Sequence, residues 1–201
     1  SVAAIMPVDV PEAEWASLQI MFATSDGDVR RNALDDFTNV MRNGKIAMKL
    51  PDGVRLIGAR ICSEDDDVML AARDGRAIRF RVTDVRVFKG RDSTGVRGVS
   101  LGEGEEVISL SILRHFDATP GERNSFLKLY GANRRAATGD EPDTETVITD
   151  DGEGETDEAA LSVERYAEMD AAQQFILTIS EKGFGKISSS YDFRTSNRGG
   201  K

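Results

Sequence analysis

The sequence predicts an all-β fold made of repeated, propeller-like blades. An apolar run that ends at a turn glycine occurs three times, with shifts of 48 and 156 residues, at residues 20–27, 68–75 and 176–183. A second strip, which contains glycine, recurs in step at residues 43–50, 94–101 and 199–201. A fixed period of about 50 residues is typical of propellers and solenoids. We therefore expect a partial disc of blades, each with four antiparallel strands.

The predicted strands are short and end at turn residues. Residues 20–24 and 68–72 are apolar and precede Asp-Gly turns, which favour hairpins because glycine adopts a positive φ without strain. The turns at 51–53 and 102–104 lead into further strands at residues 56–61 and 107–112.

Two segments between these strands recur as connections. Residues 34–41 are expected to form a helical turn or two, and residues 82–88 repeat them in the next unit. The blades are therefore predicted to occupy residues 1–116, about two repeats, and residues 174–201, the start of the next blade.

Residues 117–173 interrupt the repeat and are predicted to form an acidic insertion. They contain 15 acidic and 5 basic residues. One short helix is expected from Pro120 to Ala137, and a second is expected from a cap at Thr156 to Gln174. Residues 139–155 have almost nothing to bury and are expected to be disordered. The insertion is expected to be dispensable for folding, and it is either an autoinhibitory flap that competes with a ligand or a spacer.

Composition excludes several classes of protein. No apolar run in the 201 residues approaches the roughly 20 that a membrane-spanning helix needs, and residues 1–10 show no secretory signal. Cys62 is the single cysteine, which rules out a disulfide framework. We therefore expect a cytoplasmic protein that has no membrane partner.

The net charge of −9 argues against a nucleic-acid partner only when the chain is taken as a whole. Outside residues 117–173 there are 21 basic and 20 acidic residues, and the two signs are segregated along the chain. A neutral sum of this kind is compatible with a basic stripe on the surface.

Residues 90–104, Gly-Arg-Asp-Ser-Thr-Gly-Val-Arg-Gly-Val-Ser-Leu-Gly-Glu-Gly, resemble the C-terminal domain of the DNA gyrase A subunit, and so do residues 43–50 and 67–70. The resemblance covers residues 1–116 and 173–201. It implies a β-pinwheel, a disc that wraps duplex DNA around a basic rim and so supports ATP-dependent negative supercoiling. It also implies two partners, the gyrase B subunit and the N-terminal part of the A subunit. In the holoenzyme, ATP and Mg²⁺ are then bound by other domains. The related domain of topoisomerase IV is an alternative.

The chain departs from this family in three respects. It lacks the breakage–reunion domain, so Tyr130, Tyr166 and Tyr191 inherit no catalytic role. We expect it to start after the family's first blade, and only residues 198–201, Arg-Gly-Gly-Lys, match the family's seven-residue box. We expect a fragment of two to three blades.

The candidate DNA contacts are basic residues that recur after the turn glycines or before the glycine strips. Binding to phosphates requires only cations spaced along a surface, without base-reading geometry. For each residue the alternative is an ordinary solvated side chain. The predicted contacts are Arg30, Arg31, Arg42, Lys45, Arg76, Arg79, Arg81, Lys89, Arg91, Arg97, Lys186, Arg194, Arg198 and Lys201.

No catalytic, metal or cofactor site is predicted in this fragment. His115 follows an apolar strand without a partner at a recognisable spacing, and Cys62 is interpreted as a packing residue. The acidic runs at residues 64–67 and 150–158 lack the spacing of a calcium loop. The chain is expected to be a non-enzymatic DNA-binding module, with a propeller-like protein-interaction scaffold as the alternative.

Overall fold

The computed structural model describes residues 4–38, 42, 44, 46–139 and 159–200. It divides into two compact units. One consists of Ser1–His115 together with Thr195–Lys201, and the other consists of Phe116–Arg194. The two units are described separately below.

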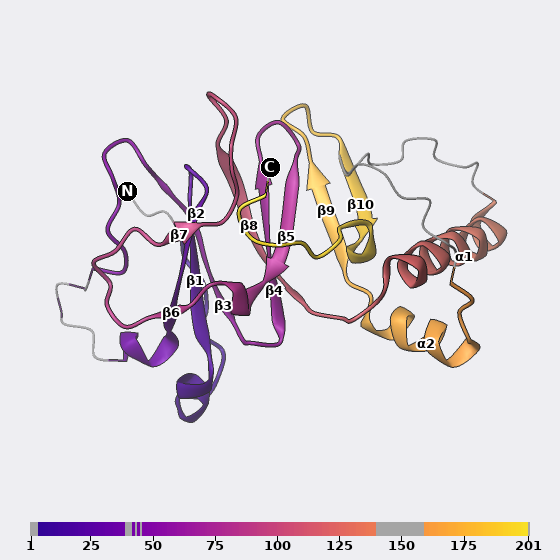
Figure 1. Cartoon of the computed structure of the whole chain (residues 1–201), viewed down its shortest axis with the longest axis horizontal. Coiled ribbons are helices and arrows are strands. Elements are labelled where there is room, and N and C mark those ends of the chain that lie inside the picture. The colour runs from indigo at the N-terminus through magenta and orange to yellow at the C-terminus, as the bar shows by residue number, and fades with distance from the viewer. Residues whose placement is uncertain (1–3, 39–41, 43, 45, 140–158, 201) are drawn as a thin grey trace. The chain divides into compact units, whose positions relative to one another are not determined.

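The first sheet of the larger unit is built on the first repeat. β1 (Gln19–Thr24) pairs antiparallel with both β2 (Asp28–Ala33) and β3 (Leu56–Cys62). Two short strands of the second repeat, β6 (Val87–Phe88) and β7 (Val96–Arg97), add to the outer side of β2 (Figure 1). β6 runs parallel to β2, so the following repeat supplies the last edge of the first blade.

The second sheet repeats this arrangement. β4 (Asp66–Ala72) lies between β5 (Ala77–Arg81) and β8 (Val107–Arg114), and it pairs antiparallel with both. Thr195 forms a parallel bridge with Arg79 of β5, as Val87 does with Arg31 of β2. Short 3-10 turns, η2 (Leu34–Phe37) and η3 (Val82–Asp84), follow β2 and β5 at the predicted connections.

Side chains from both sheets form one apolar core. Because side chains alternate along a strand, Met21 and Ala23 of β1 contact this core together with Val68, Leu70 and other buried residues of the second sheet. The opposite face of β1, with Ile20 and Phe22, packs in a second cluster with Leu34, Ala59 and partly buried residues, some of which come from the N-terminal segment. That segment includes Trp15 in η1 (Glu12–Ser17), a turn that the sequence did not indicate. Every residue of β1 is therefore buried.

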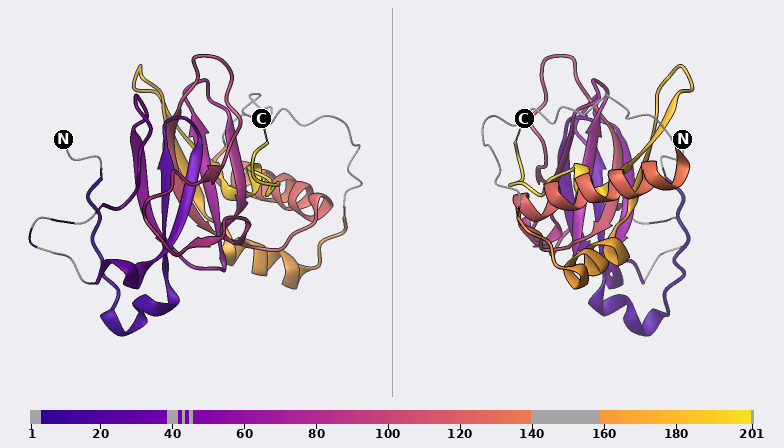
Figure 2. Two further views of the ribbon diagram at one scale, coloured as in Figure 1. Left: turned by 60° about the vertical axis from the view of Figure 1, so that its left-hand side comes forward. Right: turned by 90° about the vertical axis from the view of Figure 1, so that its right-hand side faces the viewer.

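The smaller unit contains two helices and a hairpin. α1 (Pro120–Thr138) and α2 (Val163–Ala172) lie side by side in all views (Figure 2), and β9 (Phe175–Ile179) pairs antiparallel with β10 (Gly185–Ser189). A capping box between Thr119 and Glu122 begins α1, where the sequence predicts a helix. Ser162 caps α2, so the predicted start of this helix at Thr156 is wrong.

The predicted insertion shares its core with the third repeat. Phe126 of α1, Met169 of α2 and Tyr191 of η4 (Ser190–Asp192) are almost fully buried in one cluster. The Tyr191 hydroxyl donates a 2.8 Å hydrogen bond to the backbone carbonyl of Met169. This shared core argues against the expectation that residues 117–173 can be removed without effect on the fold, because their removal would expose Tyr191.

The all-β, pinwheel-like class predicted for the repeats is confirmed. The expected four antiparallel strands per blade are corrected, because the described strands form one sheet of five, in which β6 runs parallel to β2, and one sheet of three. The glycine strips are also less regular than expected. In residues 94–101 only Val96 and Arg97 form a strand, and residues 46–50 form none. Disorder was predicted for residues 139–155, and all of these except Gly139 lie outside the described residues. None of the helices that the structure describes is both long and apolar enough to cross a membrane.

Candidate nucleic-acid interface

The connection into the second repeat is held along β2 at both of its ends. β6 fixes one end through Asn32 and Phe88, and β7 fixes the other through Asp28 and Arg97. Gly95 permits this close approach, because its φ is +107° and a Cβ there would collide with the carbonyl oxygen of Val29. Residues 89–95 therefore form a loop that lies directly on the first sheet.

Arg30, on β2 of the first sheet, anchors this loop. Its side chain is fully buried, and its Nη1 donates hydrogen bonds of 2.6 and 2.8 Å to the carbonyls of Arg91 and Ser93. Its Nη2 donates to the carbonyl of Gly90. Asn32 adds bonds from Nδ2 to the carbonyls of Phe88, at 2.9 Å, and Gly90, at 3.2 Å. Burial lowers the pKa of the Arg30 guanidinium from its ordinary value.

The outer side of the connection carries cations. Lys89 is exposed, Arg91 is half-buried and lies over the ring of Phe37, and Arg86 stacks on Phe88 with its Cζ 3.8 Å from the ring centroid. Stacking on an aromatic face holds a guanidinium in place while leaving its charge accessible. Three basic side chains from six consecutive residues are thus displayed at the edge of the first blade.

Arg97 and Arg198 form a second basic group where two repeats meet, at the β7 end of β2. Arg97 has 54% of its side chain exposed and pairs with Asp28, with Nε 3.1 Å from Oδ1. Burial and the nearby Asp26 raise the pKa of the Asp28 carboxyl, whereas Arg97 lowers it. Arg198, from the third repeat, donates from Nη1 to the carbonyl of Arg97 at 2.5 Å and from Nε to the carbonyl of Asp84 at 3.2 Å.

The backbone beside Arg198 is paired with the glycine strip of the preceding repeat. Gly199 donates to the carbonyl of Gly98 at 2.8 Å, and Ser100 donates to the carbonyl of Gly200 at 2.9 Å. This backbone pairing brings the glycine strips of successive repeats side by side in the larger unit. It therefore places basic residues that are distant in sequence on one strip of surface.

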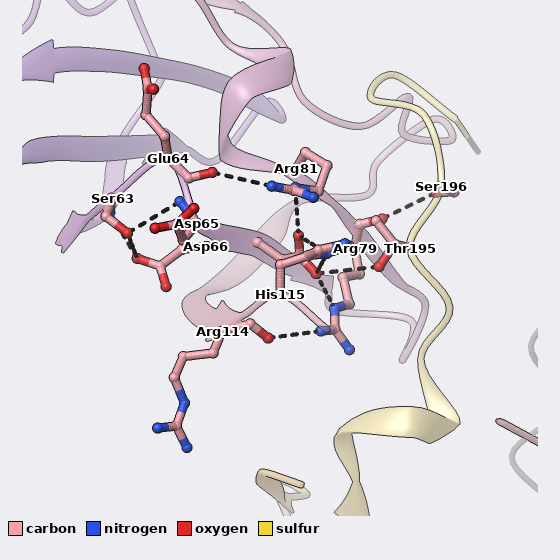
Figure 3. Close-up of polar contacts among 11 residues, drawn as sticks. Ser63, Glu64, Asp65, Asp66, Arg79, Arg81, Arg114, His115, Thr195 and Ser196 are labelled. Atoms are coloured by element: carbon pink, nitrogen blue, oxygen red, sulfur yellow. Dashed lines mark hydrogen bonds and ion pairs between the residues drawn. The ribbon is translucent and has the colours of Figure 1, made fainter. Parts of the chain in front are cut away.

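A second set of predicted contacts forms a buried charge cluster. The carboxylate of Asp67 is fully buried. Arg79, Arg81, His115 and Thr195, which are labelled in Figure 3, converge on it. Arg79 Nε donates at 2.8 Å, His115 Nδ1 lies 2.9 Å from Oδ1, and Thr195 Oγ1 donates at 3.2 Å. Next to Thr195, the third repeat also donates a backbone N–H to the carbonyl of Arg79 at 2.8 Å. The cluster therefore fastens the third repeat's connection to the edge of the second blade.

Three of the predicted contacts with DNA are corrected by this burial. Arg30, Arg31 and Arg79 are at most 5% exposed, so none of them presents its charge to a duplex. The physical reason is that β2 and β5 are covered on both faces, by the core on one side and by the next repeat on the other. Arg31 is directed toward Glu64, with Nη1 3.8 Å from Oε1, and the other two hold backbone or carboxylate acceptors.

The other predicted residues are distributed as follows. Arg42 is exposed, Arg76 is exposed and paired with Asp74, and Arg81 is half-buried beside Asp67. Lys186 and Arg194 are exposed in the smaller unit. Lys45 and Lys201 lie outside the described residues. In the larger unit, Lys89 and Arg91 therefore lie on the connection at the β6 end of β2, and Arg97 and Arg198 lie together at its β7 end.

Sequence reasoning missed Arg86, the anchor Asn32 and the pairing of His115 with Asp67. Arg86 was detectable, because Arg194 stands 108 residues later, the same shift that relates Gly75 to Gly183. Asp67 was also conspicuous as a carboxylate at the head of the apolar run 68–72. Among the residues that the structure describes, no group of three metal-ligating side chains gathers.

Comparison with known families agrees with this repeat geometry. The family described as "DNA gyrase C-terminal domain, beta-propeller" matches residues 19–63, 66–114 and 174–201, which are the three repeats without the helical segment. The chain belongs to this DNA gyrase C-terminal domain family. Arg86, Lys89, Arg91, Arg97 and Arg198 all lie within the matched ranges.

Longer relatives of this gyrase C-terminal domain are gyrase A subunits. The chain is 51% identical to the DNA gyrase A subunit of Granulibacter bethesdensis over 203 residues, and 41% identical to that of Rickettsia bellii over 197. These alignments cover 99% and 98% of the chain but only 22% and 21% of the relatives, so the chain spans about a fifth of their length. The Escherichia coli protein is 40% identical over 113 residues, which are 56% of the chain and 12% of that protein.

Two solved structures are also similar. The DNA gyrase A C-terminal domain is 28% identical with a TM-score of 0.44, covering 49% of this chain and 32% of that one. The C-terminal domain of DNA topoisomerase IV is 19% identical with a TM-score of 0.49, covering 55% of this chain and 33% of that one.

Proposed function

We propose that this gyrase C-terminal domain is a non-catalytic module that binds and wraps duplex DNA along the basic connections of its blades. The observation that carries the proposal is the repeated pairing of each connection with the preceding blade, β6 on β2 and Thr195 on β5. This pairing lays a basic segment along the edge of each blade. Because phosphates are read without base contacts, the module accepts duplexes of any sequence.

In the longer gyrase protein, the proposed wrapping supports negative supercoiling driven by ATP. The chain itself contributes no cofactor site in this proposal. The B subunit and the N-terminal part of the longer protein bind ATP and Mg²⁺ and cleave the DNA strands. Bending DNA costs elastic energy, so the module has to offer contacts on more than one blade. Arg86, Lys89 and Arg91 on one blade, with Arg97 and Arg198 at the junction to the next, meet this requirement.

The test is duplex affinity measured against salt for two unrelated sequences. Each phosphate contact contributes a slope of about −0.9 to the plot of log affinity against log salt. Lys89→Gln is expected to weaken both duplexes equally and to reduce the slope by about one contact. Arg60→Gln is the matched control, because Arg60 is an exposed cation on β3, the opposite edge strand of the same sheet. Affinity that is independent of salt, or a strong preference for one sequence, would contradict the proposal.

A second experiment places the substitutions in the complete gyrase holoenzyme. Charge reversal at Arg91 and Arg97 is expected to lower negative supercoiling while DNA cleavage is retained, because these residues bind DNA without taking part in the chemistry. Loss of cleavage and supercoiling to the same extent would show that the module does more than hold DNA.

A further inference from the structure

The loop at residues 89–94 has an unusual backbone orientation. The carbonyl oxygens of Gly90, Arg91 and Ser93 all turn inward to the guanidinium of Arg30. In a trans peptide the C=O of one residue and the N–H of the next point in opposite directions, and no described peptide bond is cis. The N–H groups of Arg91, Asp92 and Thr94 therefore point away from Arg30.

None of these three N–H groups donates in the loop and turn backbone hydrogen bonds of the residues that the structure describes. Asp92 and Ser93 are exposed, and Arg91 and Thr94 are half-buried, so the outer side of the loop is open to a ligand. A run of outward backbone N–H groups forms an anion-binding surface, because each contributes a partial positive charge. Lys89 and Arg91 add full charges beside it.

We propose that residues 89–94 form a phosphate-binding site for duplex DNA, in which Arg30 is a positioning residue that never touches the ligand. The inference rests on the proposed function. The buried guanidinium orients three peptide dipoles with their positive ends outward. Its five-donor fork suits this task, since two of its nitrogens serve three acceptors. A lysine retains the charge but lacks the planar fork.

Asp92 is the negative group of this loop and limits its affinity. Its exposed carboxylate lies on the same segment as the outward N–H groups and repels a phosphate. Asp28, which faces Arg97, and Asp36, whose carbonyl accepts from Arg91, are further acidic residues near the connection. A neutral side chain at position 92 is therefore expected to strengthen DNA binding.

The experiment compares Arg30→Lys with Arg60→Lys in the complete chain, with duplex affinity and thermal unfolding measured for each. Arg30→Lys is expected to weaken duplex binding about fivefold, the value of one net hydrogen bond, although the charge is conserved. Arg60→Lys is expected to leave affinity unchanged. In a Lys89→Ala background the effect of Arg30→Lys is expected to shrink, because both residues act at one site.

Asp92→Asn keeps the inference testable if Arg30→Lys does not fold. This surface variant is expected to fold normally and to bind duplexes several-fold more tightly at low salt, with a gain that declines as salt rises. If the wild-type chain binds DNA but Asp92→Asn and Arg30→Lys bind like wild type, the inference is wrong and the proposed function stands. If the wild-type chain binds no DNA, the proposed function itself is wrong.

Discussion

Replacing Asp67 by asparagine is expected to destabilise the larger unit by about 3–5 kcal/mol, the usual cost of leaving one partner of a buried ion pair alone. The carboxylate is fully buried, and Arg79, whose side chain is 6% exposed, loses its counter-charge. Arg81, with 32% of its side chain exposed, can turn to water. The predicted loss therefore comes mainly from Arg79, and also from His115 and Thr195, which contact the same carboxylate.

Urea unfolding followed by circular dichroism measures this loss as a shift in midpoint at constant slope. Glu64→Gln is the matched control, because Glu64 is 67% exposed and stands 3.8 Å from Arg31, so its change is expected to cost less than about 1 kcal/mol. A double variant, Asp67→Leu with Arg79→Met, is expected to recover part of the stability, since it removes both buried charges. Equal midpoint shifts for Asp67→Asn and Glu64→Gln would refute the reasoning.

Three further predictions concern single residues. Gly95→Ala is expected to destabilise the chain more than Gly104→Ala, for which about 1 kcal/mol is typical. Both glycines have a positive φ, but only at Gly95 would a Cβ collide with backbone atoms, and thermal unfolding of the two variants measures the difference. Burial raises the pKa of the Cys62 thiol to about 12, so its alkylation at pH 8 is expected to be slow until urea unfolds the chain; labelling of native protein at the rate of a free thiol would contradict this. Hydrogen bonds from Arg165 and from the Thr119 backbone lower the pKa of Glu122 below 4.5. The small stability advantage of wild type over Glu122→Gln is therefore expected to be complete above pH 4.5 and to disappear as pH falls through the pKa of Glu122 in the folded chain, which helix content measured against pH checks.

The strands were predictable because their signals are local. Residues 20–24 and 68–72 are contiguous apolar runs that end at a glycine turn, and β1 and β4 occupy these positions. The 3-10 turn at Leu34–Phe37 was likewise indicated by its own sequence. In each of these cases the residues that decide the conformation are neighbours in the chain.

The candidate interface was only half predictable because the burial of an arginine depends on distant residues. Arg30 and Arg97 both lie near turn glycines, yet one is fully buried and the other is largely exposed. Arg30 is buried by a loop 60 residues away in sequence, and this contact follows from the pairing of β6 with β2. A list of basic residues cannot separate anchors from surface cations until that pairing is known.

The addition of each connection to the preceding blade also sets an order of events during protein synthesis. The edge of β2 at Asn32 stays open until Phe88, 56 residues later, has been synthesised. The edge of β5 at Arg79 stays open until Ser196, 117 residues later, has been synthesised. At about 5–20 residues per second, these delays are roughly 3–11 s and roughly 6–23 s. An open strand edge pairs readily with other chains, so the nascent second blade stays vulnerable to aggregation about twice as long as the first. The segment that contains α1 and α2 lies between Arg79 and Ser196 in the sequence, so its synthesis lengthens the time for which the edge of the second blade stays open.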